Sequence, residues 1–239
     1  MSGSTLRPGG LTLTDSAVDF CGFDQTHLVL DAGCGSGVTT RHLWEKYRIR
    51  SMGTDLSLNL PSNRPLDLAS KNPRENRSFR PGFAQSRLTA LPFKSRVFNG
   101  IFCECVLSLI PDKKRCLAEF FRLLKTNGKL ILTDLYIPQL FEIKIAQRQI
   151  HPPNSCIDGA ITLMNLIRLI EDAGFKIDII EEHTRLLKQL AGQMVFEHGS
   201  LNNFWEKVTG SICDNSLSRA CRTGALRPGY CMIIAGKYE

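Results

Sequence analysis

The stretch His27–Val38 reads HLVLDAGCGSGV and decides the fold of this chain of 239 residues. Its apolar run Leu28–Leu30 predicts a buried parallel strand that ends at Asp31. From Gly33 onward a glycine stands at every second position, which predicts a tight turn, and a helical pattern begins directly after it. A strand, a glycine-rich turn and a helix N-terminus in this order form a ligand-binding corner in α/β proteins.

A second acid supports the prediction of a ligand at this corner. Asp55 lies eighteen residues past Gly37, at the end of a second strand-like run, Ile49–Thr54. A carboxylate in this place accepts hydrogen bonds from the hydroxyls of a ribose. The two features together predict a cofactor that contains an adenosine, whereas a glycine-rich turn without a ligand is the alternative interpretation.

An acid directly before the glycines narrows the choice of cofactor. The carboxylate of Asp31 would repel the phosphates of a dinucleotide but attract an ammonium or a sulfonium. The run Asp31–Gly37, together with Gly53–Ser57, resembles the first motifs of the class I S-adenosylmethionine-dependent methyltransferases.

Later stretches resemble the small-molecule branch of the same class, the UbiE-like enzymes (methyltransferase type 11). These stretches are Ala90–Phe93 followed by Phe98–Ile101, Phe120–Gly128 with Leu130–Asp134, and Ala173–Phe175. The main similarity covers roughly residues 27–135. It implies a doubly wound, Rossmann-like α/β fold, in which a seven-stranded, mostly parallel sheet has an antiparallel last strand.

The resemblance also implies S-adenosylmethionine as the cofactor and S-adenosylhomocysteine as the product. The implied cofactor-binding residues are Asp31, Gly33, Cys34, Gly35, Gly37, Asp55, Leu56, Leu88 and Cys103. One position departs from the family pattern, because Arg87 stands where an aspartate commonly accepts from the adenine amino group. An arginine cannot accept a hydrogen bond, so either the backbone around Leu88 does this alone or Arg87 turns away.

Methyl transfer from a sulfonium needs in-line positioning more than strong acid–base help. A general base matters only for an acceptor that is protonated at the working pH. The candidate bases follow strands whose carboxyl ends face the cofactor, and they are Glu104, Tyr136 and His183. Their alternative roles are a carboxylate at the cofactor rim, a packing tyrosine and a surface histidine. The segment Leu6–Thr14 is a candidate lid, with a disordered tail as the alternative.

The nine cysteines are odd in number and include no C-x-x-C pair, so reduced thiols are predicted rather than a disulfide framework. The five scattered histidines give no zinc-binding spacing, and no metal site is predicted. Thiolates prefer soft ions, which makes four cysteines candidate ligands for a soft acceptor such as a metalloid. These are Cys103, Cys105, Cys213 and Cys221.

Strand-like and helical patterns alternate along the chain, which favours a parallel sheet covered on both faces. The predicted strands are Leu28–Asp31, Ile49–Thr54, Gly82–Gln85, Phe98–Glu104, Lys129–Asp134, Phe175–Ile180 and Tyr230–Ala235. The predicted helices are Asp15–Cys21, Val38–Lys46, Lys113–Leu124, Leu163–Ala173 and Arg185–Glu197. Thr14 and Thr162 are predicted to cap helices, and Asn127–Gly128 to form a left-handed turn.

The length fits a single domain over residues 1–239, with an N-terminal lid and helix (1–26), a cofactor-binding half (27–135) and a substrate-side half (136–239). Two segments break the alternation of strands and helices. Leu60–Pro81 contains four prolines, and Ser211–Pro228 is small and polar. Both are predicted to contain irregular loops.

The composition argues against several classes of protein. The hydrophobic share of 43% and the charged share of 22% are typical of soluble globular proteins. No apolar stretch approaches the ~20 residues that span a bilayer, and the N-terminus lacks a signal-peptide core, so a cytoplasmic protein is expected. Much of the net charge of +7 comes from Asn63–Arg80, which has a single aromatic residue, so nucleic-acid binding is not expected.

The sequence therefore predicts methyl transfer from S-adenosylmethionine to a small-molecule acceptor. One alternative is an RNA or protein methyltransferase, suggested by the basic segment. Another is a non-catalytic S-adenosylmethionine-binding scaffold, suggested by Arg87 and by the prolines of Leu60–Pro81. A homodimer is an open alternative for the oligomeric state.

Overall fold

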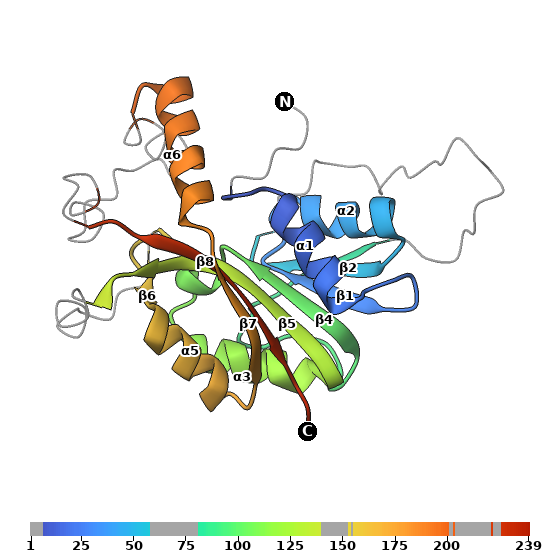
Figure 1. Cartoon of the computed structure of the whole chain (residues 1–239). Helices are drawn as coiled ribbons and strands as arrows, with labels where there is room; N and C mark the ends of the chain where they lie inside the picture. Colours follow the sequence, from blue (N-terminus) through green and yellow to red (C-terminus); the bar gives the residue numbers. More distant parts are fainter. Residues whose placement is uncertain are drawn as a thin grey trace, which may run out of the picture.

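The computed structural model describes residues 7–57, 81–139, 153, 155–200, 203, 221 and 226–239. These residues form one sheet with helices on both faces (Figure 1). The predicted loops Leu60–Pro81 and Ser211–Pro228 lie outside the described residues, apart from Pro81, Cys221 and Leu226–Pro228. Among the described helices, none has the length and apolar character needed to cross a membrane.

The strands form a mostly parallel sheet. They are β1 (Leu28–Ala32), β2 (Arg50–Asp55), β3 (Gly82–Gln85), β4 (Phe98–Glu104), β5 (Leu124–Ile137), β6 (Ile161–Thr162), β7 (Lys176–Glu182) and β8 (Gly229–Gly236). Seven lie in the order β3-β2-β1-β4-β5-β8-β7, and the two-residue β6 pairs with β5 beside this path. Only β8 is antiparallel to its neighbours, β5 and β7. The predicted sheet with an antiparallel last strand is confirmed, and β6 is an addition that no prediction covered.

The order of the strands reverses beside β1. The chain passes from β1 outward to β2 and β3, and then returns to place β4 on the other side of β1. Asp31 near the end of β1 consequently pairs with Gly53 of β2 on one side and with Phe102 of β4 on the other. The connections leave the sheet in opposite directions at this point, and ligands bind in the resulting crevice at the carboxyl ends of the strands.

The helices are α1 (Thr12–Cys21), α2 (Val38–Tyr47), α3 (Lys113–Leu123), α5 (Leu163–Asp172) and α6 (Thr184–His198), with a short 3₁₀ turn at Leu107–Leu109. The predicted cap Thr162 is confirmed, because its hydroxyl accepts from the amide of Asn165 at 3.3 Å. The predicted cap Thr14 is wrong. The first helix begins at Thr12, three residues before the predicted start at Asp15, and its N-cap residue Leu11 makes no side-chain cap.

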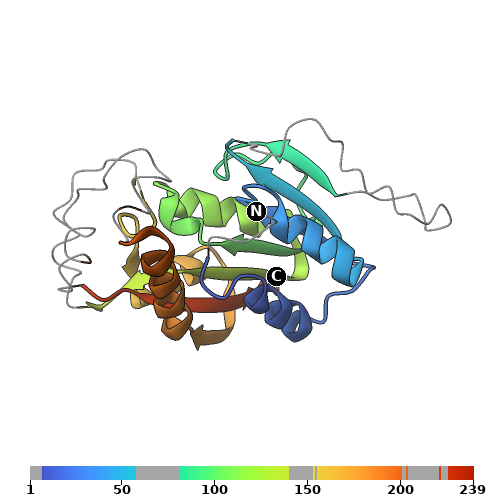
Figure 2. The same cartoon turned by 90° about the horizontal axis from the view of Figure 1, so that it is seen from above.

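Two apolar layers cover the two faces of the sheet. On one face α3 and α5 bury residues such as Phe120 and Ile170 against the strands. On the other face α1 and α2 bury Ala17 and Leu43, while α6 contributes Leu187 to the same cluster. Figure 2 shows α2 and α6 over different ends of the sheet. The first turn of α1 and the residues before it lie at the carboxyl end of β4, where Thr14 and Arg7 both contact Glu104.

Candidate functional site

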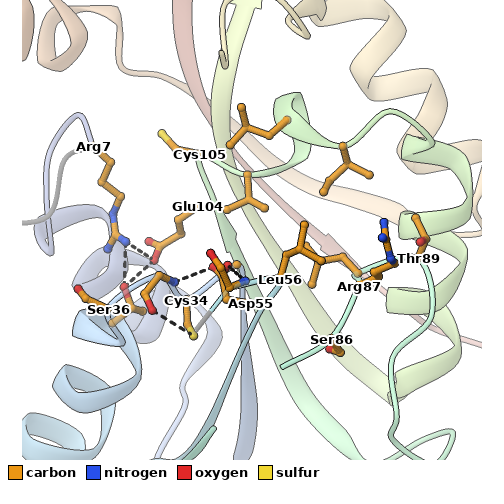
Figure 3. A pocket seen from close by; sticks show the side chains of 18 of the residues that line it. Arg7, Cys34, Ser36, Asp55, Leu56, Ser86, Arg87, Thr89, Glu104 and Cys105 are labelled. Atoms are coloured by element: carbon orange, nitrogen blue, oxygen red, sulfur yellow. Dashed lines mark hydrogen bonds and ion pairs between the residues drawn. The ribbon is translucent and has the colours of Figure 1, made fainter. Parts of the chain in front are cut away.

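A pocket of about 820 Å³ lies where the carboxyl ends of β1, β2 and β4 meet (Figure 3). Its walls come from the glycine turn, the end of β2, the segments after β3 and β4, and the N-terminal turn. The lining residues are Arg7, Gly33, Cys34, Gly35, Ser36, Val38, Thr39, Asp55, Leu56, Ser57, Ser86, Arg87, Leu88, Thr89, Glu104, Cys105, Val106, Leu109, Ile110 and Pro111. The pocket therefore coincides with the reversal of strand order.

Backbone hydrogen bonds hold the glycine turn close to β2. The amides of Gly33 and Cys34 both donate to the carbonyl of Thr54, at 2.7 and 3.0 Å. Gly33 has a φ of 79°, and a Cβ at this residue would lie 2.4 Å from Val106 Cγ2. Gly35 has a φ of 52°, and a Cβ there would meet no atom within 4 Å. The turn thus packs tightly on one side and leaves open space on the other.

Asp55 connects β2 to this turn. Its Oδ2 accepts from the amide of Gly35 at 2.9 Å, and its Oδ1 accepts from the amide of Ser57 at 3.1 Å. Each carboxylate oxygen retains a further lone pair for a ligand hydroxyl. The next residue, Leu56, leaves 58% of its surface exposed at the pocket. A carboxylate and an apolar side chain are therefore adjacent, as a sugar and a flat apolar ring would require.

Asp31 lies behind the glycine turn and does not line the pocket. Only 3% of its surface is exposed, and its Oδ2 accepts from the amide and the hydroxyl of Thr40. Burial raises the pKa of Asp31 to about 7, against the opposing effect of the Thr40 hydrogen bonds. The structure thus gives this predicted methionine-binding residue a contact with helix α2.

The segment after β3 forms the opposite side of the pocket from Arg7 and Glu104 (Figure 3). The amide of Ser86 donates to the carbonyl of Asp55 at 2.9 Å, which fixes the start of this segment on β2. Leu88 is 5% exposed and lines the pocket, as does Arg87. Arg87 therefore stays beside the pocket although its side chain cannot replace the acceptor that the family pattern has there.

The end of β4 carries a buried ion pair. Arg7 Nη1 lies 2.9 Å from Glu104 Oε2, and the two side chains are 11% and 2% exposed. Thr14 donates to Glu104 Oε1 at 2.8 Å, and Thr39 donates to Glu104 Oε2 at 3.1 Å. Both hydroxyls also accept from Arg7, at 2.7 and 2.8 Å. The predicted base Glu104 lines the pocket, and its carboxylate accepts three hydrogen bonds, one on Oε1 and two on Oε2.

Cys105 follows in a left-handed backbone conformation, with a φ of 59°. Its Sγ lies 3.2 Å from the hydroxyl of Tyr230, which is fully buried and bonded to Thr133. Burial raises the pKa of the Cys105 thiol well above its usual value, so the pocket contains a neutral thiol. Of the cysteines predicted to bind a soft acceptor, Cys105 alone is found among the lining residues, and Cys213 lies outside the described chain.

Several other predicted site residues do not line the pocket. Gly37 has a φ of 74° and precedes α2, so it shapes the turn. Cys103 is fully buried in the apolar layer with α3. His183 lies 3.0 Å from Glu181, and the Tyr136 hydroxyl lies 3.4 Å from a Glu182 oxygen, and all four belong to the region around the end of β7. The structure does not bring these two candidate bases together with Glu104.

Sequence reasoning missed much of the pocket. The sequence identified the segment Leu6–Thr14 as a candidate lid, but it did not identify the side chain of Arg7 as part of the pocket. Thr39 lies in the first turn of α2, whose N-terminus was expected to face the ligand. The apolar wall formed by Val106, Leu109, Ile110 and Pro111 follows β4, where only the cysteines and Glu104 had been singled out.

Two observations concern the chemistry of the described residues. No three His, Cys, Asp or Glu side chains within the described ranges are grouped as metal ligands would be. The eight cysteines in those ranges are free thiols, as the sequence predicts for reduced cysteines.

Comparisons with known proteins agree with this geometry. Residues 30–132 match the model of a family described as a methyltransferase domain. The chain is 26% identical to phosphoethanolamine N-methyltransferase 1 of Triticum aestivum over 239 residues, covering 96% of this chain and 45% of that protein. It is 27% identical to the arsenite methyltransferase of Halobacterium salinarum over 154 residues, covering 62% and 37%. The chain thus spans less than half the length of these two relatives.

The fold also matches a solved structure. Phosphoethanolamine N-methyltransferase 2 of Haemonchus contortus, in complex with S-adenosyl-L-methionine, superposes with a TM-score of 0.68 at 19% identity. The match covers 99% of this chain and 54% of that one. At this identity the likeness concerns the fold, which is the doubly wound sheet described above.

Proposed function

We propose that this chain, whose residues 30–132 belong to the methyltransferase domain family, transfers a methyl group from S-adenosylmethionine to a small-molecule acceptor. One observation carries the proposal. Within the matched region, the amide of Gly35 in the glycine turn lies 2.9 Å from the Asp55 carboxylate, beside the reversal of strand order, and the two segments form two walls of one pocket. That is where this fold binds an adenosine-containing ligand.

The donors and acceptors of the pocket fit this cofactor. The free lone pairs of Asp55 suit the two ribose hydroxyls, and the exposed side chain of Leu56 offers an apolar surface to the adenine. The open space beside Gly35 admits a ligand chain close to the backbone. We assign no contact with the sulfonium to Asp31, because its Oδ2 is turned towards Thr40.

The bound cofactor supplies a methyl group on a positively charged sulfur, which is a good leaving group. The task of this chain is then to align the acceptor and to exclude water. The wall of Val106, Leu109 and Ile110 provides an apolar surface for both purposes. Glu104 is ion-paired and bonded through both oxygens, so the proposal gives it no role in taking a proton from the acceptor.

The acceptor itself is the part of the proposal that most needs measurement. Two of the relatives are named for phosphoethanolamine and arsenite, one an amine and one a soft metalloid species. A neutral thiol, Cys105, lies in the same pocket wall as the apolar residues. Both acceptors therefore belong in the first panel of assays, together with neutral apolar amines and thiols.

The proposal also includes the domain organisation, the cellular location and the partners of the protein. We infer that residues 1–239 form a single catalytic domain without a nucleic-acid partner. We also infer a cytoplasmic location, which the free thiols of the described cysteines support. A homodimer is part of this proposal, and light scattering on the purified chain tests it. Binding to RNA that weakens with rising salt would favour an RNA methyltransferase instead.

Calorimetric titration with S-adenosylmethionine and S-adenosylhomocysteine tests the cofactor, and mass spectrometry of the acceptor panel tests the transfer. Saturable binding of both nucleosides and acceptor-dependent formation of S-adenosylhomocysteine are expected. Binding without transfer to any small molecule, but with transfer to RNA or protein, would replace the proposed acceptor class. Binding of the nucleosides without transfer to any acceptor would favour the non-catalytic scaffold, and no binding of either nucleoside would overturn the proposal.

A further inference from the structure

The turn before α1 is fastened to the pocket by four side chains, which we call the Arg7 clasp: Arg7, Thr14, Thr39 and Glu104. Arg7 and Glu104 contact each other directly at 2.9 Å. They are also linked twice through hydroxyls, because each threonine accepts from the guanidinium and donates to the carboxylate. The clasp thus joins the N-terminal turn, α1, α2 and the end of β4.

The geometry points to a positioning role for Glu104 that it exerts through Arg7. We propose that this pair holds the N-terminal turn (residues 7–11) as one wall of the cofactor pocket, and thereby slows the release of the bound nucleoside. The inference rests on the proposed function for the identity of that nucleoside. The clasp itself consists of described contacts only.

The hydrogen bonds of Glu104 support positioning over proton transfer. Oε1 accepts from Thr14, and Oε2 accepts from both Thr39 and Arg7. All three donors point at the carboxylate, and one of them belongs to a guanidinium, which makes the strongest bonds of this kind. Uptake of a proton by Glu104 would remove the charge that pairs with Arg7 and would weaken the hydrogen bonds from Thr14 and Thr39, and all three partners are nearly buried. The burial of the pair makes this costly.

Arg7 has the geometry that a clasp needs. Its guanidinium donates to Thr14 through Nη2, to Thr39 and Glu104 through Nη1, and to the carbonyl of Gly10 through Nε at 3.1 Å. The N–H groups of the guanidinium lie in one plane and point in several fixed directions, an arrangement that a lysine ammonium cannot reproduce. Because the last of these bonds returns to its own turn, the side chain fixes the turn as well as the pocket wall.

The turn is built to be held in this place. Gly9 and Gly10 have φ values of 76° and 52°, and the amide of Gly10 donates to the carbonyl of Arg7 at 3.1 Å. A Cβ on Gly9 would lie 2.8 Å from Leu186 of α6, so the outer side of the turn packs against that helix. The inner side carries Arg7 into the pocket. The turn therefore separates the pocket from α6, and loosening it opens the pocket on this side.

The test compares the full chain with Arg7→Met, Glu104→Gln, the double variant and Arg7→Lys. Arg50→Met serves as the matched control, because Arg50 is exposed and bonds only a carbonyl near the other end of the sheet. Two measurements are made on each protein. Hydrogen exchange of the amides of residues 7–14 is followed without ligand, and the dissociation rate of S-adenosylhomocysteine is followed by stopped flow.

Arg7→Met and Glu104→Gln are each expected to speed dissociation about tenfold or more. The double variant is expected to be no faster than the faster single variant, since both changes break one unit. Arg7→Lys is expected to speed dissociation less than Arg7→Met does. The control, Arg50→Met, is expected to leave the dissociation rate unchanged. The amides of residues 7–14 should exchange faster in the same variants, whereas those of β4 should not. A purely structural defect would lower protection throughout the fold and would not respond to the lysine.

Glu104→Gln with an unchanged dissociation rate and unchanged exchange would overturn the inference. So would effects of the two single variants that add in the double variant. If Glu104→Gln does not fold, the Arg7 variants carry the test by themselves. If the unaltered protein binds no S-adenosylhomocysteine, the proposed function has failed, and the exchange measurement still decides whether the clasp exists.

Discussion

Asp31 Oδ2 accepts two hydrogen bonds from Thr40, one from the backbone amide at 2.9 Å and one from the hydroxyl at 2.6 Å. Thr40 is the third residue of α2, and its amide has no partner within the helix. The acid at the end of β1 therefore caps the helix that follows the glycine turn. A carboxylate is also favoured there by the helix dipole. This contact fixes both ends of the turn that forms the floor of the pocket.

Removing the hydroxyl from this contact should cost stability. Thr40→Val deletes the 2.6 Å bond to Asp31 and leaves the shape nearly unchanged. We expect the free energy of unfolding to fall by about 1–2 kcal/mol, as for a buried hydrogen bond. Urea denaturation measures it. Thr26→Val is the control, because Thr26 bonds Asp24 in an exposed turn, and an equal loss there would contradict the special role of the buried pair.

The raised pKa of Asp31 predicts how stability depends on pH. The folded carboxyl has a pKa of about 7, above its unfolded value of 3.8, so between these values the folded protein holds the extra proton. This stabilisation is fully present below pH 3.8 and is lost as the pH rises through 7, to a total of about 4 kcal/mol. Buried Asp134, whose pKa is also raised, acts in the same direction.

Denaturation curves at intervals between pH 4 and 8 measure this slope, with Asp31→Asn as the comparison. The variant keeps an oxygen that accepts from Thr40 but cannot ionise, so its slope should be smaller. Equal slopes in both proteins would show that Asp31 titrates at its ordinary value in the folded state.

The sequence predicted the sheet well because its signals are local. The run before Asp31 and the run Phe98–Glu104 are apolar and short, and both became central strands with the predicted bounds or within one residue of them. The short strand Gly82–Gln85 was also found as predicted. The end of β5 was not, since Tyr136 and Ile137 extend it by pairing with β6, a contact between segments far apart in the chain.

The site was predicted less completely for the same reason. Gly33 and Asp55 belong to motifs with fixed spacing, and the structure brings them into one pocket. Glu104 was singled out by its position after a strand, but its chemistry depends on Arg7, ninety-seven residues earlier. Thr14 reads as a helix cap from its neighbours alone, and only the folded chain shows that its hydroxyl serves the ion pair. Partnerships over such distances leave no pattern in the sequence.

Asp55→Ala should weaken cofactor binding strongly. The change removes the expected acceptor of the ribose hydroxyls and the bond that Asp55 makes to the amide of Gly35. We expect the Kd for S-adenosylmethionine to rise about 10- to 150-fold, as for lost hydrogen bonds to a charged group. Calorimetry measures it, with Asp24→Ala in an exposed turn as the control. Unchanged affinity would mean that the ribose does not lie at Asp55.

Gly33 and Gly22 provide a matched pair for the last prediction. Both have left-handed backbone conformations, with φ values of 79° and 63°. A Cβ at Gly22 would meet nothing within 4 Å, whereas a Cβ at Gly33 would lie 2.4 Å from Val106. Gly22→Ala should therefore cost about 1–2 kcal/mol of stability from backbone strain alone. Gly33→Ala should cost a further ~1–3 kcal/mol from overpacking.

The two costs at Gly33 can be separated. Adding Val106→Ala to Gly33→Ala removes the methyl groups that the new Cβ would meet, so the overpacking should be relieved while the backbone strain stays. The double variant should then unfold at a urea concentration closer to that of Gly22→Ala. If Gly33→Ala is no less stable than Gly22→Ala, the glycine turn does not press against the residue after β4. The close packing that closes this side of the pocket would then be absent in solution.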